Sequence, residues 1–365
     1  MNFTSRITLK PQYFKEKETT FAETEDMHVS LFRYNSGVCG LRLSNLNGSL
    51  ILLPFQGQQI WSATFDNRSL KMSSIFDEPA PTQEYLKNYG GFFIHCGLTG
   101  IGNPAPDDPH PLHGELPNAP YKEACLKIGT DKIGNYMELK GSYDYKRAFS
   151  YNYIAQPSVR LYANATTVQI SMEISNLSSK PLEYMYLAHI NFSLVENSAI
   201  FTTANERADD VTIRKQVISE FEANEPYRRF FQKVSENPAI LNNITPELIL
   251  DPELVAFYTY KSDEMGWAHS LQCHPDGYAS YVKHRPSELE HVTRWMVRTE
   301  DEQALGLALP ATAQPEGYAA EKKKNNIKIL PPKGKIGFAM EAGITRPEQT
   351  SVIREKIRQV KNSEI

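Results

Sequence analysis

The stretch VQISMEIS (residues 168–175) alternates strictly between apolar and polar side chains. Its first, third, fifth and seventh positions are valine, isoleucine, methionine and isoleucine, and the residues between them are glutamine, serine, glutamate and serine. A period of two is typical of a β-strand that buries one face and turns the other towards solvent or a neighbouring layer. We therefore predict that this stretch is a strand in a sheet whose apolar face packs on a second layer.

The same strand signal recurs on both sides of this stretch. Asn47-Gly48 separates the apolar run 41–43 from the run 50–53, which is a strong signal for a hairpin. Many strands joined mainly by turns are typical of a sandwich or a barrel, so we predict an all-β fold. Further runs that we interpret as strands are 257–261, 278–282, 292–297, 304–309 and 335–342.

Two segments depart from the strand pattern. Residues 205–245 are polar and charge-mixed with aromatic side chains at loosely helical spacing, which predicts a helical insertion. Residues 346–361 carry an apolar stripe among charged residues, which predicts an amphipathic C-terminal helix docked on the sandwich. No repeat or linker divides the chain, so we expect residues 1–365 to form a single domain. Long irregular stretches at 73–89 and 99–121 are of a length that usually serves function.

The composition argues against several classes of partner. The 365 residues carry a net charge of −4, which leaves no basic surplus for nucleic acid or an anionic membrane. No run approaches the ~18 apolar residues that a membrane-spanning helix needs. Residues 1–15 are mixed and polar and lack the apolar core of a signal peptide. We therefore expect a cytoplasmic protein with no nucleic-acid or membrane partner; its oligomeric state stays open.

The cysteines give no sign of a metal or redox centre. Cys39, Cys96, Cys125 and Cys273 are widely scattered, and no CxxC pair or other metal-ligand spacing occurs. They are expected to be reduced and mostly buried thiols. We accordingly predict that the protein needs neither a metal nor a cofactor.

The densest cluster of unusual residues is YGGFFIHCGLT (residues 89–99), followed by a loop rich in proline and aspartate and then PLHGE (residues 111–115). The double glycine and Gly97 permit close backbone approach or a positive φ. His113 lies at the end of the loop, directly before a glycine. We interpret it as a site residue rather than a surface or core histidine.

Two later strands carry polar residues on one face. In YMYLAHINF (residues 184–192), His189 and Asn191 share a face of the strand, which indicates either a satisfied buried network or the wall of a polar pocket. In IGFAMEAG (residues 336–343), Gly337 and Ala339 share a face with Glu341. These small residues leave room for a ligand beside the carboxylate.

Taken together, the ordered motifs GGFFIHCGLT, PLHG, HINF and the late ME resemble the aldose 1-epimerase-like proteins of the DUF4432 family. The resemblance covers roughly residues 35–345. It implies a galactose-mutarotase-like β-supersandwich with a sugar site in the concave face of one sheet. It further implies a mutarotase in which Glu341 is the base, His189 is the acid and His113 holds the sugar oxygens.

The sequence departs from the family pattern at several positions. Mutarotases carry an arginine upstream of Leu-His-Gly, but no arginine occurs between Tyr89 and His113. Many relatives have an arginine directly after Leu-His-Gly, where this chain has Glu115, and a glutamate before the late proline, where it has Leu309. The sugar-binding aspartate of mutarotases has no assigned counterpart.

Mutarotation opens a hemiacetal ring and recloses it on the other face, so one group must remove the anomeric proton and another must protonate the ring oxygen. A carboxylate and a histidine can both be tuned to this task near neutral pH. We predict that His113, His189 and Glu341 converge on one pocket. Further hydrogen bonds and an apolar stacking face are expected from Asn191, Asn103, Arg294, Trp295 and Trp61.

The ligand is expected to be a neutral free sugar, because the motifs contain no lysine or arginine with which to bind an acidic group, although Arg68 or Arg294 could reach in from another strand. A non-catalytic carbohydrate-binding protein on the same fold is the alternative that the missing arginine favours. A third possibility is a metal-dependent sugar isomerase of the cupin type that uses His95, His113, His189 and a carboxylate. Its usual His-X-His spacing is absent.

Overall fold

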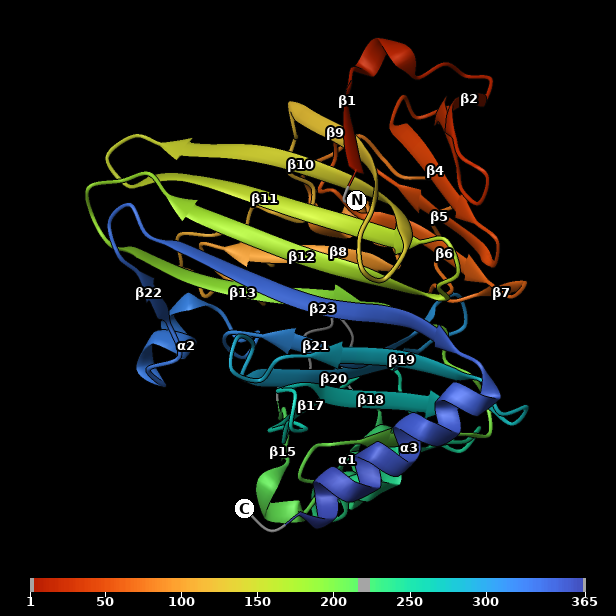
Figure 1. Ribbon diagram of the computed structural model, residues 1–365. Coiled ribbons are helices and arrows are strands. Elements are labelled where there is room, and N and C mark those ends of the chain that lie inside the picture. The colour runs from red at the N-terminus through yellow and green to blue at the C-terminus, as the bar shows by residue number, and fades with distance from the viewer. Residues whose placement is uncertain (1–2, 216–223, 364–365) are drawn as a thin grey trace.

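The computed structural model describes residues 3–215 and 224–363. Within them the chain forms two large antiparallel sheets that pack face to face (Figure 1). One sheet has ten strands, in the order β1 (Phe3–Leu9), β9 (Glu123–Thr130), β10 (Asn135–Arg147), β11 (Tyr151–Tyr162), β12 (Thr167–Asn176), β23 (Lys335–Thr345), β19 (Ala279–His284), β18 (Ala268–Cys273), β14 (Ser198–Thr202) and β16 (Asn243–Ile244).

The second sheet has thirteen strands in the described residues, eleven along a main path and two short strands that pair beside it. Its main path runs through β15 (Thr212–Ile213), β17 (Leu254–Tyr258), β20 (His291–Arg298), β21 (Gln303–Ala311), β13 (Leu182–Ile190), β8 (Phe93–Leu98), β6 (Ile60–Phe65), β5 (Gly48–Leu52), β4 (Cys39–Asn45), β3 (His28–Arg33) and β2 (Thr19–Glu23). Off this path, β22 (Lys328–Leu330) pairs with β13 and β7 (Arg68–Ser69) pairs with β6.

The alternating stretch that opened the sequence analysis is the core of β12. The apolar side chains of β12 are buried in the main core, and the strand pairs with β11 on one side and β23 on the other. The Asn47-Gly48 hairpin is present between β4 and β5, where Asn45 pairs with Gly48. The predicted all-β sandwich is therefore confirmed.

One contact between the sheets fixes which way the site strands face. Tyr186 of β13 stacks on Phe338 of β23, with ring centroids 4.8 Å apart and an interplanar angle of 6°. Because side chains alternate along a strand, Leu187 and His189 lie on the side of β13 that faces away from the ten-stranded sheet. By the same rule, Glu341 lies on the side of β23 that faces away from the thirteen-stranded sheet.

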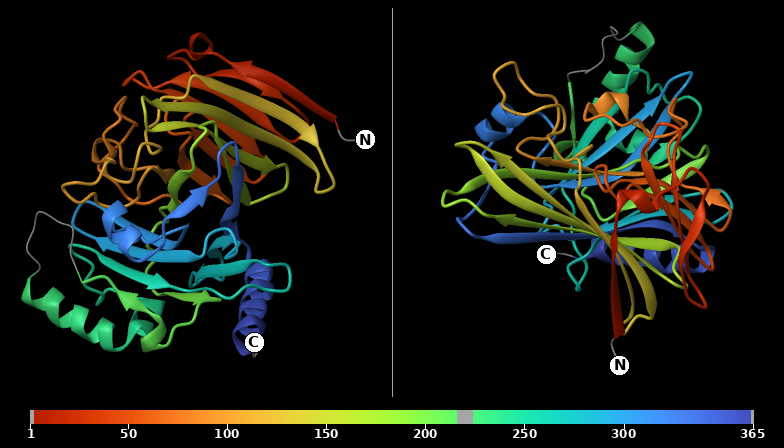
Figure 2. Two further views of the ribbon diagram at one scale, coloured as in Figure 1. Left: turned by 90° about the vertical axis from the view of Figure 1, so that its left-hand side faces the viewer. Right: turned by 90° about the horizontal axis from the view of Figure 1, so that it is seen from above.

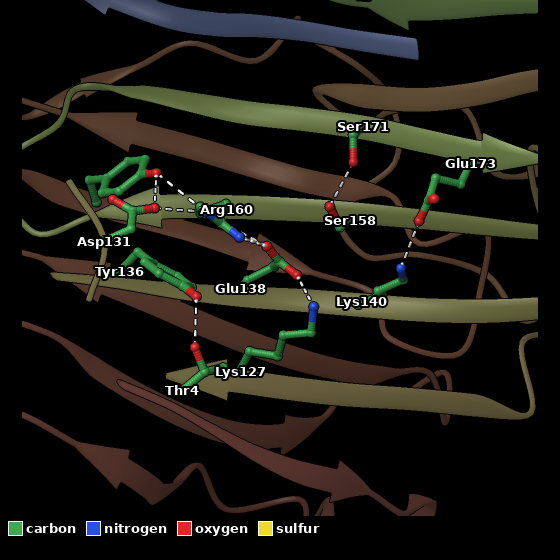
Figure 3. A network of polar contacts seen from close by, with 11 residues as sticks. Thr4, Lys127, Asp131, Tyr136, Glu138, Lys140, Ser158, Arg160, Ser171 and Glu173 are labelled. Atoms are coloured by element: carbon green, nitrogen blue, oxygen red, sulfur yellow. Dashed lines mark hydrogen bonds and ion pairs between the residues drawn. The ribbon is translucent and has the colours of Figure 1, made fainter. Parts of the chain in front are cut away.

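The outer face of the ten-stranded sheet is polar (Figure 3). Glu138 of β10 has a side chain only 5% exposed, and it accepts hydrogen bonds from Lys127 of β9 and Arg160 of β11 at 2.8 Å each. On the next strands, Ser158 and Ser171 share a hydrogen bond of 2.8 Å. These cross-strand pairs give the polar side chains of this part of the face their hydrogen-bond partners.

Three α-helices lie outside the sheets in the described residues, and none is long and apolar enough to span a membrane. The C-terminal helix α3 (Pro347–Asn362) confirms the predicted terminal helix and buries Ile357 against Leu271 and Tyr281 of the ten-stranded sheet. The region 205–245 contains α1 (Glu225–Glu236), together with short strands, while residues 216–223 lie outside the described part. Figures 1 and 2 place α1 and α3 towards the same end of the molecule. The third helix, α2 (Tyr318–Lys323), follows β21.

The long irregular stretches cover part of the thirteen-stranded sheet. Residues 73–92 contain one 3₁₀ turn, Tyr85–Lys87, and lead into β8. Residues 99–121 form an irregular loop between β8 and β9. Both stretches contribute walls to the pocket described next.

Candidate functional site

A pocket of about 170 Å³ lies on the outer face of the thirteen-stranded sheet. Its floor comes from β13, β17, β20 and β21, and its walls come from the two long loops and from the residue after β15. This volume is below the ~300–1,000 Å³ of pockets for drug-sized ligands, which suits a small molecule. The polar and aromatic side chains that line it include Tyr89, His113, His189, Arg214, Glu253 and Trp295.

The orientation of His189 is set by Asn191 behind it. The Asn191 amide group donates from Nδ2 to the carbonyl oxygen of Gly91 at 3.0 Å, so its Oδ1 is left to face the imidazole. His189 Nδ1 lies 2.7 Å from that oxygen and therefore carries the proton. In the neutral ring Nε2 is then a hydrogen-bond acceptor, with the Tyr89 hydroxyl 3.5 Å away.

The loop residue His113 has the opposite arrangement. The backbone N–H of Gly102 donates to His113 Nδ1 at 3.4 Å, which makes Nδ1 the acceptor and leaves the proton on Nε2. The residue itself adopts a left-handed φ of 57°. The following Gly114 is required by space as well as by its φ of 80°, because a Cβ there would lie 2.3 Å from the carbonyl oxygen of Gly97.

The two imidazoles lie against each other and are both neutral at physiological pH. Their ring centroids are 5.6 Å apart in an edge-to-face arrangement. Burial lowers the pKa of His189 to about 4, and the hydrogen bond to Asn191 opposes this only in part. Burial, together with the neighbouring His189 and Arg214, holds the pKa of His113 well below its usual value.

Arg214, Glu253 and Trp295 form a second polar cluster in the pocket. Arg214 Nη2 contacts Glu253 Oε1 at 2.6 Å, and the Trp295 indole N–H donates to Glu253 Oε2 at 2.6 Å. The carboxylate therefore fixes both a cation and an aromatic ring. The ring of Trp295 also lies edge-to-face with His189, with centroids 5.4 Å apart.

The structure separates Glu341 from the two histidines. Glu341 lies on the outer face of the ten-stranded sheet, where it accepts a hydrogen bond from Thr167 and pairs with Lys283 at 2.7 Å. His113 and His189 lie on the outer face of the other sheet, so both layers of the sandwich stand between them and Glu341. The predicted convergence of all three residues is therefore wrong for Glu341. The alternation along residues 336–343 predicted which side chains share a face with Glu341, but it could not predict which of the two sheets this strand would join.

Two of the predicted sugar contacts also lie elsewhere. Arg294 is fully buried on the inner side of β20, where Nη1 donates to Asn242 Oδ1 at 2.7 Å and the guanidinium lies over the Tyr258 ring. Trp61 is buried in a small apolar cluster with Val38 and Leu53. Neither residue lines the pocket. For Arg294 the reason is alternation along β20, which turns its side chain to the opposite side of the strand from Thr293 and Trp295.

The remaining predicted residues do gather at the site. His113, His189, Trp295 and Asn103 line the pocket, and Asn191 supports His189 from behind. Leu309, which occupies the place of the glutamate of many relatives, also lines the pocket. The residues after Leu-His-Gly serve the loop instead, since Glu115 accepts hydrogen bonds from Thr99 and Tyr153.

The sequence analysis did not predict that Arg214 and Glu253 line the site. Arg214 lies within the predicted insertion, outside every motif, and Glu253 directly precedes β17. Neither position shows a local pattern that indicates a pocket. The missing arginine of the loop is thus matched by an arginine that reaches the pocket from another part of the chain. Among the described residues, no three His, Cys, Asp or Glu side chains are grouped as metal ligands.

Comparisons with known proteins identify a family and a fold for this chain. The model of DUF4432, a domain of unknown function, matches residues 36–344. No curated protein matches the chain. A candidate aldose 1-epimerase from Klebsiella pneumoniae is similar over 100% of this chain and 97% of its own, with a TM-score of 0.81 and 14% identity. A galactose mutarotase-like protein from Clostridium acetobutylicum covers 88% of this chain and 100% of its own, with a TM-score of 0.59 and 11% identity. At these identities the likeness shows the fold, which is galactose mutarotase-like.

Proposed function

The chain belongs to the DUF4432 family, and from that premise we propose that it binds a free sugar in the histidine pocket and interconverts its anomers by acid–base catalysis. One observation carries the proposal. The two facing imidazoles are both neutral, and their neighbours leave His189 Nε2 as an acceptor and His113 Nε2 as a donor. A hemiacetal needs an acceptor at its anomeric hydroxyl and a donor at its ring oxygen.

The reaction is written with His189 as the base. Its Nε2 takes the proton of the anomeric hydroxyl, and the electron pair of that O–H bond forms the carbonyl as the bond from the anomeric carbon to the ring oxygen breaks. The pair of the broken bond goes to the ring oxygen, which accepts a hydrogen bond from His113 Nε2–H. The His189 imidazolium then returns its proton to that oxygen. Rotation of the carbonyl end and reversal of these steps close the ring on the other face.

Asn191 is the positioning residue for this base. Its Oδ1 holds the proton on His189 Nδ1 and stabilises the imidazolium while it exists, as the orienting partner of a catalytic histidine does. The role of Glu341 in the sequence-based scheme therefore passes to His189, whose depressed pKa keeps it in the proton-accepting form.

The charges of the pocket favour a neutral ligand. Arg214 and Glu253 are in direct contact, so their formal charges cancel before a ligand arrives. The indole of Trp295 offers an apolar face to the C–H groups of a sugar ring, while the polar groups around it meet the hydroxyls. We therefore propose a neutral monosaccharide as the substrate class.

Leu309 favours a second candidate function, namely sugar binding without catalysis. An apolar side chain stands in the pocket where many relatives carry a glutamate. A binding protein of this fold could dispense with that carboxylate, whereas an enzyme must replace its contribution, here through His189.

One experiment separates these two functions. A panel of neutral aldoses is screened by calorimetry for binding and by NMR saturation transfer for anomer exchange. The enzyme proposal predicts that at least one bound sugar exchanges its anomers faster than in buffer. A sugar that binds tightly and exchanges at the buffer rate supports the binding protein instead, and a failure of every sugar to bind contradicts both.

A further inference from the structure

Thr293 has a buried hydroxyl without a partner. The residue lines the pocket from β20, next to Trp295, and is only 2% exposed. Its Oγ1 makes no hydrogen bond within the described residues. A hydroxyl withdrawn from water without a partner costs stability, whereas valine of nearly the same shape would not incur that cost.

Other buried threonines of this fold are satisfied. Thr312, which directly follows β21, is 1% exposed and accepts a hydrogen bond from the backbone N–H of Tyr186 at 2.9 Å. Thr166 donates to the carbonyl oxygen of Ile344 at 2.7 Å. Thr293 is thus the exception among the buried threonines that the structure describes, and it lines the pocket, as does Tyr85, whose buried hydroxyl also lacks a partner.

We propose that Thr293 recognises one hydroxyl of the ligand and thereby determines which sugars the pocket accepts. The inference rests on the proposed function, because it takes the ligand to be a sugar. A threonine hydroxyl can donate to and accept from a sugar hydroxyl at once. A site that buries a polar group for this purpose discriminates strongly against an analogue that lacks the matching hydroxyl, since the protein group then stays unpaired.

The first test needs no ligand and compares two isosteric substitutions. Thr293→Val is expected to raise the thermal midpoint of the ligand-free protein, because it removes an unpaired buried hydroxyl. Thr312→Val is the matched control and is expected to lower the midpoint, because it leaves the Tyr186 N–H without an acceptor. A fall for Thr293→Val comparable to that of Thr312→Val would show a structural bond for Thr293 and overturn the proposal.

The second test identifies the hydroxyl that Thr293 binds. Calorimetry measures the affinity of wild type and Thr293→Val for the best sugar of the aldose panel and for its monodeoxy analogues. The substitution is expected to weaken binding of the parent sugar by about 10-fold. For one deoxy position alone, the same substitution should make little further difference, because the partner hydroxyl is already gone.

The failures of the two proposals are distinguishable. If wild type binds none of the sugars, the proposed function fails and the role of Thr293 fails with it. If wild type binds a sugar and Thr293→Val binds it equally well, the proposed function stands and the role of Thr293 is overturned. Equal losses for the parent and every deoxy analogue would also overturn it, since they indicate a change of pocket shape.

Discussion

His189 and His113 differ in which ring nitrogen their own surroundings occupy. Asn191 takes up Nδ1 of His189, while the backbone N–H of Gly102 takes up Nδ1 of His113 as an acceptor. Two side chains of the same type thus present opposite hydrogen-bonding characters to the pocket. Burial reinforces this division, because it holds both rings in the neutral state in which the two nitrogens differ.

The depressed pKa of His189 has a consequence for acid stability. The folded-state pKa is about 4, below the ordinary value of ~6.5, so the unfolded chain binds the proton first as the pH falls. Stability is therefore full above pH ~6.5 and decreases towards pH 4, and the contribution of His189 to the loss between pH 7 and pH 5 is about 2 kcal/mol. We predict that His189→Gln removes this part of the loss, as measured by urea unfolding at both pH values.

The control for this prediction is His28→Gln. His28 on β3 makes an exposed hydrogen bond to Thr20, outside the pocket. This variant controls for the replacement of a histidine as such, so the acid loss of His189→Gln is compared with the loss measured in it. Equal losses in the two variants would show that His189 is not the buried neutral group described here.

Asn191 offers a second test through the pH profile of the reaction. Asn191→Asp would place a carboxylate beside Nδ1 and raise the pKa of His189 above its value of about 4. We predict that the acid limb of the rate of anomer exchange moves to higher pH in this variant. A lower rate with an unmoved acid limb would indicate structural damage, because the substitution also removes the bond to Gly91.

Some single residues could be assigned from the sequence and others could not. His113 was identified from its loop and the following glycine, and His189 from a polar pair on an apolar strand; the structure brings both to one pocket. The predicted position of Glu341 in the histidine pocket was wrong. Alternation along a strand shows which residues share a face of that strand, but it does not show whether that face and a face of another strand line the same pocket. Arg214 and Glu253 were missed, because their proximity arises only when the chain folds.

At the scale of elements, β20 shows how one strand serves two environments. Thr293 and Trp295 line the pocket, while Arg294 between them faces the other sheet. The sequence analysis predicted both Arg294 and Trp295 as sugar contacts, and only alternation within the folded sheet separates them. The register of the pairing between β20 and β21 also shifts between Thr293 and Trp295. The sequence shows no pattern that predicts this local irregularity.

The position of Arg294 can be tested directly. Arg294 is fully buried, and its Nε and Nη2 have no partner within the described residues. Replacing a poorly paired buried charge by an apolar residue of similar length is often neutral or stabilising, so Arg294→Met should keep the free energy of unfolding within about 1 kcal/mol of wild type or raise it. Sugar affinity should be unchanged by calorimetry. A stable variant that loses sugar binding would contradict the placement of Arg294 outside the pocket.

At the scale of the whole molecule, the two outer faces of the sandwich have different roles. One face carries the network around Glu138 (Figure 3) and, further along the sheet, the Glu341–Lys283 pair, so that these charges are matched across strands. The opposite face carries the neutral histidine pocket beneath the two long loops. Strand count and alternation predicted the sandwich itself, but the sheet to which a distant strand such as β23 adds depends on long-range packing that periodicity does not encode.

The most direct test of the account compares anomer exchange, by NMR saturation transfer, in wild type, His189→Gln and Glu341→Gln with the best-bound sugar of the panel. Both substitutions are close in size to the native side chain, and they lie on opposite faces of the sandwich. The account predicts that His189→Gln slows exchange by ~10²–10⁴-fold, the usual contribution of an acid–base group, while Glu341→Gln retains the wild-type rate. Full exchange in His189→Gln, or a comparable loss in Glu341→Gln, would contradict it.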